Sequence, residues 1–88
     1  MTPDRILHHR RRQLIAAQNI AKRYRATDVA HNAQQQIDKI DWFIANYLPS
    51  TRAWTAGHIG PNGWGPLWDN IIQTAKFIRK FENERKAA

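Results

Sequence analysis

Apolar residues recur three and four positions apart through residues 29–48, a pattern that predicts a helix with one buried stripe. The stripe consists of Ala33, Ile37, Ile40, Ile44 and Tyr47. Trp42 lies among the polar positions of the same segment. Because one helix cannot bury such a stripe alone, the segments before and after it must pack onto it.

A second amphipathic pattern predicts a helix over residues 3–25. Pro3 is tolerated in a first helical turn, and Asp4 would face the positive end of the helix dipole. The apolar arc comprises Ile6, Leu7, Leu14, Ala17, Ile20, Ala21 and Tyr24, and the opposite arc comprises Arg5, Arg11, Arg12, Lys22 and Arg23. Arg10 and Gln13 interrupt the apolar arc. We therefore expect its first half to be loosely covered or to meet a polar partner.

The apolar phase breaks between these two patterns, at residues that suit a helix start. Thr27 and Asp28 can each cap a helix, and one continuous helix would need an apolar residue at position 28. Two helices joined by a short turn pack as antiparallel neighbours. The sequence therefore predicts an αα-hairpin, in which the small Ala17 and Ala21 allow the isoleucines of the second helix to approach closely.

The chain after the hairpin changes composition and then returns to a helical pattern. Pro49 should end the second helix, and a short helical turn is expected over residues 50–56. Residues 57–66 hold all four glycines and predict an ordered loop. Pro66 can open a last helix whose apolar arc is wide enough to touch two surfaces, and residues 82–88 should fray.

Together these patterns predict a single all-α domain over residues 1–88: an antiparallel αα-hairpin plus a third C-terminal helix, with a Gly/Pro/Trp-rich loop between helices two and three. The 88 residues suffice for one modest core, and the sequence has no cysteine for a disulfide framework. The longest apolar run, residues 42–45, is far shorter than the roughly 20 residues of a membrane span. We therefore expect a cytoplasmic protein with no membrane partner.

Positive charge is concentrated in the first predicted helix. The chain carries 14 basic and 7 acidic residues, and its net charge is +7. Such a helix face can follow phosphates, and nearby polar side chains can add hydrogen bonds. The predicted nucleic-acid-binding residues are Arg5, His8, Arg11, Arg12, Gln18, Asn19, Lys22 and Arg23. The alternative is a solvated face that only keeps the protein soluble.

No constellation of residues predicts catalysis. His8 and His9 are adjacent and would point about 100° apart on a helix, so they do not form a metal site. Asp38 and Asp41 are expected to pair with basic side chains of a neighbouring helix. The glycines follow no strand and match no phosphate-binding loop. We expect a protein that is not an enzyme and that has no metal or other cofactor.

Three tryptophans are candidate partner-binding residues: Trp42, Trp54 and Trp64. Tryptophan is enriched at protein interfaces and stacks on unpaired bases, although the loop could instead fold over Trp42. The leading expectation is a non-catalytic protein that binds nucleic acid or a nucleoprotein complex. The alternative is a small inhibitor or adaptor, of the phage or mobile-element type that includes CRISPR-complex inhibitors, docking on an acidic host protein surface through Trp42 and the third helix. The wide apolar arc of that helix also allows a homodimer.

Overall fold

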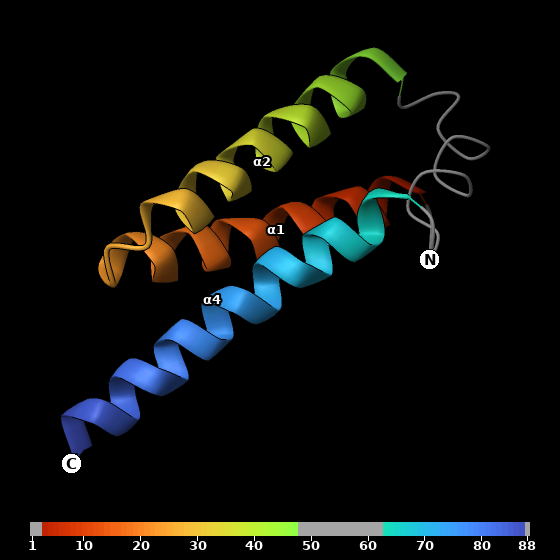
Figure 1. Ribbon diagram of the computed structural model, residues 1–88. Helices are drawn as coiled ribbons and strands as arrows, with labels where there is room; N and C mark the ends of the chain where they lie inside the picture. The colour runs from red at the N-terminus through yellow and green to blue at the C-terminus, as the bar shows by residue number, and fades with distance from the viewer. Residues whose placement is uncertain (1–2, 48–62, 88) are drawn as a thin grey trace.

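The computed structural model describes residues 3–47 and 63–87, which form three helices (Figure 1). With the labels of that figure, α1 spans Pro3–Arg23, α2 spans Thr27–Tyr47 and α4 spans Trp64–Ala87. The predicted all-α architecture, a hairpin followed by a third helix, is confirmed. The short helical turn and most of the Gly/Pro/Trp-rich loop lie outside the described residues.

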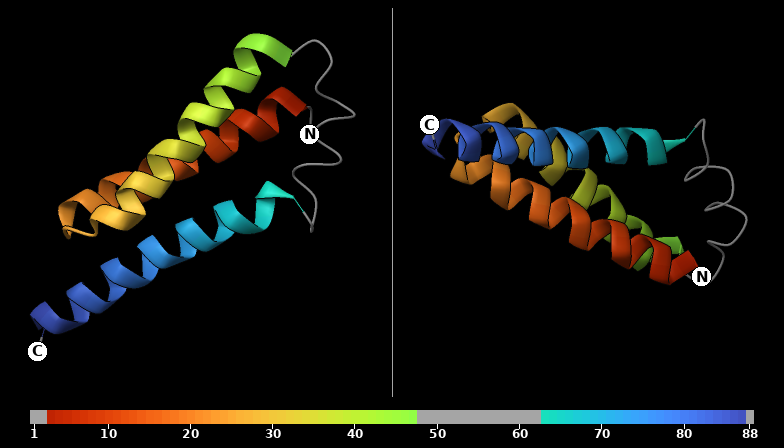
Figure 2. Two further views of the ribbon diagram at one scale, coloured as in Figure 1. Left: turned by 45° about the horizontal axis from the view of Figure 1, so that its top comes forward. Right: turned by 90° about the horizontal axis from the view of Figure 1, so that it is seen from below.

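Polar contacts between α1 and α2 show that these helices are antiparallel and in register. Arg11 donates to Asp41 near one end, and the Gln18 amide donates to Gln34 nearer the turn. As the position advances by seven along α1, the partner moves back by seven along α2. Figures 1 and 2 show the same opposed chain directions.

The α4 helix runs parallel to α1. Arg10 donates to Asp69, and the Tyr24 hydroxyl donates to Asn83; both pairs are separated by 59 positions in the sequence. A constant separation over 14 residues is the mark of a parallel, in-register pair. Figure 2 shows both helices running in the same direction. The chain therefore forms a three-helix bundle in which α1 has two neighbours.

The turn between α1 and α2 is a Schellman motif, a standard helix C-cap. The Ala26 amide donates to the Ala21 carbonyl at 2.7 Å, and the Arg25 amide donates to the Lys22 carbonyl at 3.2 Å. Arg25 has a φ of 60°, in the left-handed region that usually holds glycine. The Cβ of Arg25 therefore makes this backbone conformation less favourable than it would be for a glycine.

Replacing Arg25 by glycine should raise the free energy of unfolding by about 0.5–1 kcal/mol, because it removes the Cβ clash of the left-handed conformation. The urea midpoint measures this change. Arg12→Gly, at an exposed position inside α1, is the matched control and should lower stability by about 1 kcal/mol. A fall in the midpoint of Arg25→Gly would contradict the assigned turn.

The core forms where the three apolar faces meet. Its buried members are Leu7, Leu14, Ala17, Ala33, Ile37, Ile40, Trp68, Ile71, Ile72 and Ala75. Ala17 and Ala21 are both buried, as close packing of the hairpin requires. Trp68 is fully buried, and its indole N–H donates to the Gln36 side-chain oxygen at 3.0 Å. This polar pair at the core joins α2 to α4.

The bounds of α4 differ from the prediction at both ends. The helix begins at Trp64, so Pro66 lies within the first turn, where its missing N–H has no intrahelical partner to lose. It continues to Ala87, so the expectation that residues 82–88 fray is wrong through position 87. Asn83 bonds to Tyr24, and the Lys86 ammonium lies 5.6 Å from the Tyr24 ring centroid. These contacts tie the last turns of α4 to the end of the hairpin.

The outer side of α4 carries large apolar side chains. Phe77 and Phe81 are 66% and 54% exposed, and their rings stack with centroids 6.3 Å apart. Leu67 is also exposed. The wide apolar arc thus covers the hairpin with one part and faces solvent with another. None of the helices among the described residues has the length and apolar character needed to cross a bilayer.

Candidate nucleic-acid interface

The solvent-facing side of α1 carries a stripe of cationic and polar side chains. Because α2 and α4 both pack on the buried side of α1, Arg5, Arg12, Asn19 and Arg23 remain exposed on the opposite side. At 1.5 Å per residue, this stripe extends over about 27 Å. We call these four residues the outer face of α1. Lys22 is exposed on its flank.

Positive charge is densest at the N-terminal end of the outer face. Arg5, His8, Arg11 and Arg12 line a hollow of about 360 Å³. Arg5, His8 and Arg12 are three or four positions apart from a neighbour of this set and lie on adjacent turns of the same side of α1. Arg11 flanks them. Three guanidinium groups, each with several N–H donors, can therefore reach one anion or two neighbouring anions.

Arg11 differs from its neighbours because it is already paired. Its Nε donates to Asp41 Oδ1 at 2.6 Å, and its second nitrogen contact reaches Oδ2 at 3.3 Å. The hydrogen bond to Asp41, followed by the charge of that carboxylate, raises the pKa of the Arg11 guanidinium. Arg11 thus joins α1 to α2. Only those of its guanidinium N–H groups that do not contact Asp41 can still donate to a ligand.

Arg10 and Gln13, which interrupt the apolar arc of the first helix, do meet a polar partner. Arg10 forms an ion pair with Asp69 of α4 at 2.6 Å and also donates to the Gln13 side-chain oxygen at 3.2 Å. The partner therefore lies within the protein itself. This pair neutralises one of the three consecutive arginines.

Gln18 and Asn19, both predicted to bind a ligand, differ in their exposure to solvent. Gln18 is only 8% exposed and its amide donates to Gln34, so we remove it from the candidate interface. Burial between two helices leaves its side chain no route to a ligand. Asn19, one position later, is exposed and remains a candidate. The Arg23 guanidinium is also exposed and lies 5.8 Å from the Tyr24 ring centroid.

The acidic residues of α2 follow the expectation in part. Asp41 pairs with Arg11, as predicted for a carboxylate facing a neighbouring helix. Asp38 instead accepts a hydrogen bond from the Gln34 amide, one turn earlier on the same helix. Within residues 3–47 and 63–87, no group of three metal-ligating side chains comes together.

The candidate tryptophans are not equivalent. Trp42 is 52% exposed and meets the Phe43 ring edge-on, with centroids 5.1 Å apart. Trp64 is half-buried between Phe43 and Trp68, and the Lys39 ammonium lies 5.2 Å from its ring centroid. Trp64 thus belongs to an aromatic chain that leads into the core. Trp54 lies outside the described residues.

Comparison with protein-family models, with curated proteins and with solved structures finds no match to this chain.

Proposed function

We propose that this chain is a non-catalytic binding protein that engages nucleic acid, or a nucleoprotein complex, through α1. The observation that supports this proposal is the state of four exposed cations: Arg5, Arg12, Lys22 and Arg23. Among the described residues, none of these four forms an ion pair with a carboxylate, whereas Arg10 and Arg11 both do. Exposed cations that hold no carboxylate can bind phosphates without first breaking an ion pair.

Binding would begin with electrostatic capture of the phosphate backbone by these cations. His8 and Asn19 are exposed beside them and can donate local hydrogen bonds once the backbone is in place. The outer face of α1 extends over about 27 Å, which equals about eight base-pair steps of 3.4 Å. The hollow at Arg5, His8, Arg11 and Arg12 would receive the most tightly held phosphate.

The salt dependence of binding tests this proposal. Affinities for single- and double-stranded DNA and RNA would be measured by fluorescence anisotropy across a salt series. Neutralising four phosphates predicts a log–log slope of about −4 for a duplex and about −3 for a single strand. An unrelated basic protein of similar size and net charge is the control. Affinity no greater than that of the control at every salt concentration would refute the proposal.

The half-exposed ring of Trp42 favours a second candidate, an inhibitor or adaptor that docks on a protein. Exposed Phe77 and Phe81 on α4 extend this candidate to a homodimer. Trp42→Ala should lower the free energy of unfolding by less than about 1 kcal/mol, since much of the ring is already in water. It should weaken binding to a protein partner by about 2 kcal/mol if the ring is a hot spot. Urea unfolding distinguishes a loss of stability from a loss of binding. A large loss of stability would show that Trp42 supports the fold.

A further inference from the structure

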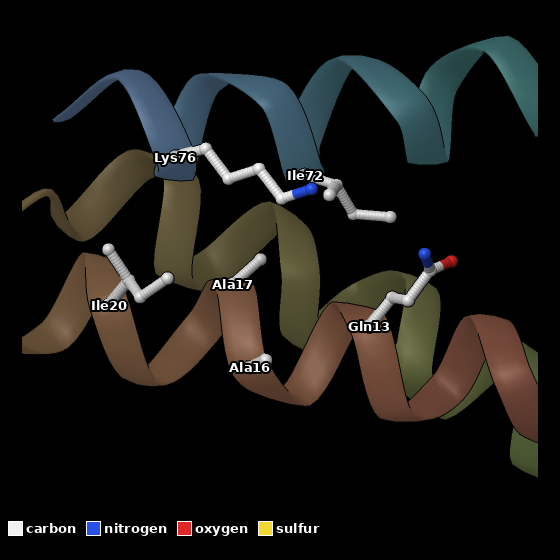
Figure 3. Close-up of a pocket in the computed structure, with 6 residues that line it drawn as sticks. All are labelled: Gln13, Ala16, Ala17, Ile20, Ile72 and Lys76. Atoms are coloured by element: carbon white, nitrogen blue, oxygen red, sulfur yellow. The ribbon is translucent and has the colours of Figure 1, made fainter. Parts of the chain in front are cut away.

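A small apolar groove lies between α1 and α4, apart from the hollow on the basic side of α1. It has a volume of about 100 Å³ and is lined by Gln13, Ala16, Ala17, Ile20, Ile72 and Lys76 (Figure 3). The ion pair of Arg10 with Asp69 lies beyond one end, and the hydrogen bond of Tyr24 with Asn83 lies beyond the other. These two contacts hold the helices in register on either side of the groove.

The groove exists because α1 presents small side chains at this level of the bundle. Ala17 faces a span of α4 that contributes Ile72 and Lys76, and the exposed Ala16 lies at the edge of the groove. Neither alanine fills the space between the two parallel helices, and Ile20 closes the floor toward the hairpin turn. The floor is therefore aliphatic, and its side chains offer no hydrogen-bonding group to a base or a sugar.

The rim of the groove carries two donors. In Figure 3 the Lys76 side chain extends along α4 toward Ile72, and the Gln13 amide turns toward α4. Lys76 forms no ion pair with a carboxylate of the described residues. The Gln13 oxygen accepts a hydrogen bond from Arg10, which leaves its N–H₂ group to donate outward. A ligand at this rim would meet a positive charge and an amide donor, which together match a carboxylate.

The volume of the groove limits what can enter it. Sites for metabolites and drug-sized ligands enclose roughly 300–1,000 Å³, whereas a cavity of about 150 Å³ holds benzene. A groove of about 100 Å³ therefore accepts one branched aliphatic group, the size of a leucine side chain. A free metabolite with so small an anchor would bury little area. A protein segment can add contacts along both helices.

We propose that this groove docks an acidic segment of a partner protein. A leucine, isoleucine or valine side chain of that segment inserts against Ala16, Ile20 and Ile72. A neighbouring aspartate or glutamate accepts hydrogen bonds from the Lys76 ammonium and the Gln13 amide. This site adds a protein partner to the proposed nucleic-acid contact and uses the side of α1 that faces α4.

The test is a methyl and amide NMR titration of the full chain with the capped pentapeptide Glu-Glu-Leu-Glu-Glu. We expect saturable shifts at Ala16, Ala17, Ile20 and Ile72, with an affinity in roughly the millimolar range. The peptide with alanine in place of leucine should bind about tenfold more weakly, because it loses most of the buried aliphatic area.

Two variants of the protein locate the peptide. Lys76→Gln should weaken binding about threefold, as expected for a rim ion pair, and Ala16→Leu should abolish the shifts by filling the groove from its exposed edge. Lys80→Gln, one turn further along α4 and absent from the lining, is the matched control and should bind as the wild type does.

Three outcomes would overturn the proposal. The first is equal binding of the leucine and alanine peptides with shifts only around Arg5 and Arg12, which would indicate electrostatic attachment to the basic side of α1. The second is unchanged affinity in both Lys76→Gln and Ala16→Leu. The third is concentration-dependent shifts of the groove signals without peptide, which would assign the groove to a second copy of this chain.

Discussion

Replacing Trp68 by alanine is expected to destabilise the protein more than any other single truncation. Trp68 is completely buried, and it is the largest fully buried side chain among the described residues. Truncation of a buried tryptophan costs about 3–5 kcal/mol, from lost transfer free energy and the cavity left behind. Small domains have a total stability of roughly 5–15 kcal/mol. The urea midpoint should therefore fall steeply, and part of the population should unfold without denaturant.

The hydrogen bond of Trp68 to Gln36 provides a finer test of the same packing. Trp68→Phe keeps an aromatic ring but leaves the Gln36 oxygen buried without its donor, which should cost about 1–3 kcal/mol. Gln36→Met removes that oxygen at similar volume. The double variant should therefore recover about 1 kcal/mol relative to Trp68→Phe alone.

The controls for this prediction use the same helix. Phe77→Ala truncates an exposed aromatic side chain of α4 and should change stability by less than about 1 kcal/mol. A midpoint for Trp68→Ala within error of that for Phe77→Ala would show that Trp68 does not occupy the core. Equal midpoints for Trp68→Phe and the double variant would show that the bond to Gln36 contributes nothing.

The helices were predictable because each depends on periodicity within one segment. The phase break at Thr27 predicted the hairpin, and the wide apolar arc of the last helix predicted that this helix packs on another surface of the protein. The polar partner of Trp68 was not predictable. Gln36 is a polar residue near the edge of the apolar stripe of α2, and its burial follows only from how α4 is rotated against that helix. The rotation of one helix against another does not produce a periodic pattern in the sequence, so it could not be predicted from that pattern.

The basic side of α1 was likewise predictable, whereas the state of each cation was not. A helical wheel places Arg11 and Arg12 together, yet only Arg11 faces Asp41 across the hairpin. That difference depends on interhelix register. One signal was present in the sequence: Arg10 and Gln13 stood out on an apolar arc, and Arg10 does contact α4. The register also explains why Gln18, predicted to bind a ligand, is buried.

Reversing Arg5 and Arg12 together to glutamate is expected to lower affinity for nucleic acid about 100-fold at low salt. The two side chains line the same hollow and are both exposed. Losing two phosphate contacts should also reduce the magnitude of the log–log salt slope by about 2. Fluorescence anisotropy across the salt series measures both quantities. Circular dichroism should show unchanged helix content, since a glutamate at position 5 lies in the first turn of α1, where the helix dipole favours it.

Arg5 and Arg12 are chosen because their reversal should affect ligand binding without disturbing the fold. Arg11→Glu would place a second carboxylate against Asp41 and weaken the hairpin, so lost binding could reflect lost structure. Arg79→Glu with Lys80→Glu is the matched control, because both positions are exposed on α4 and the formal net charge of +7 falls by the same amount. The control should stay within about threefold of the wild type, as expected for long-range charge alone. Equal losses in the two double variants would mean that the ligand responds to net charge, and the outer face of α1 would then have no special role in binding.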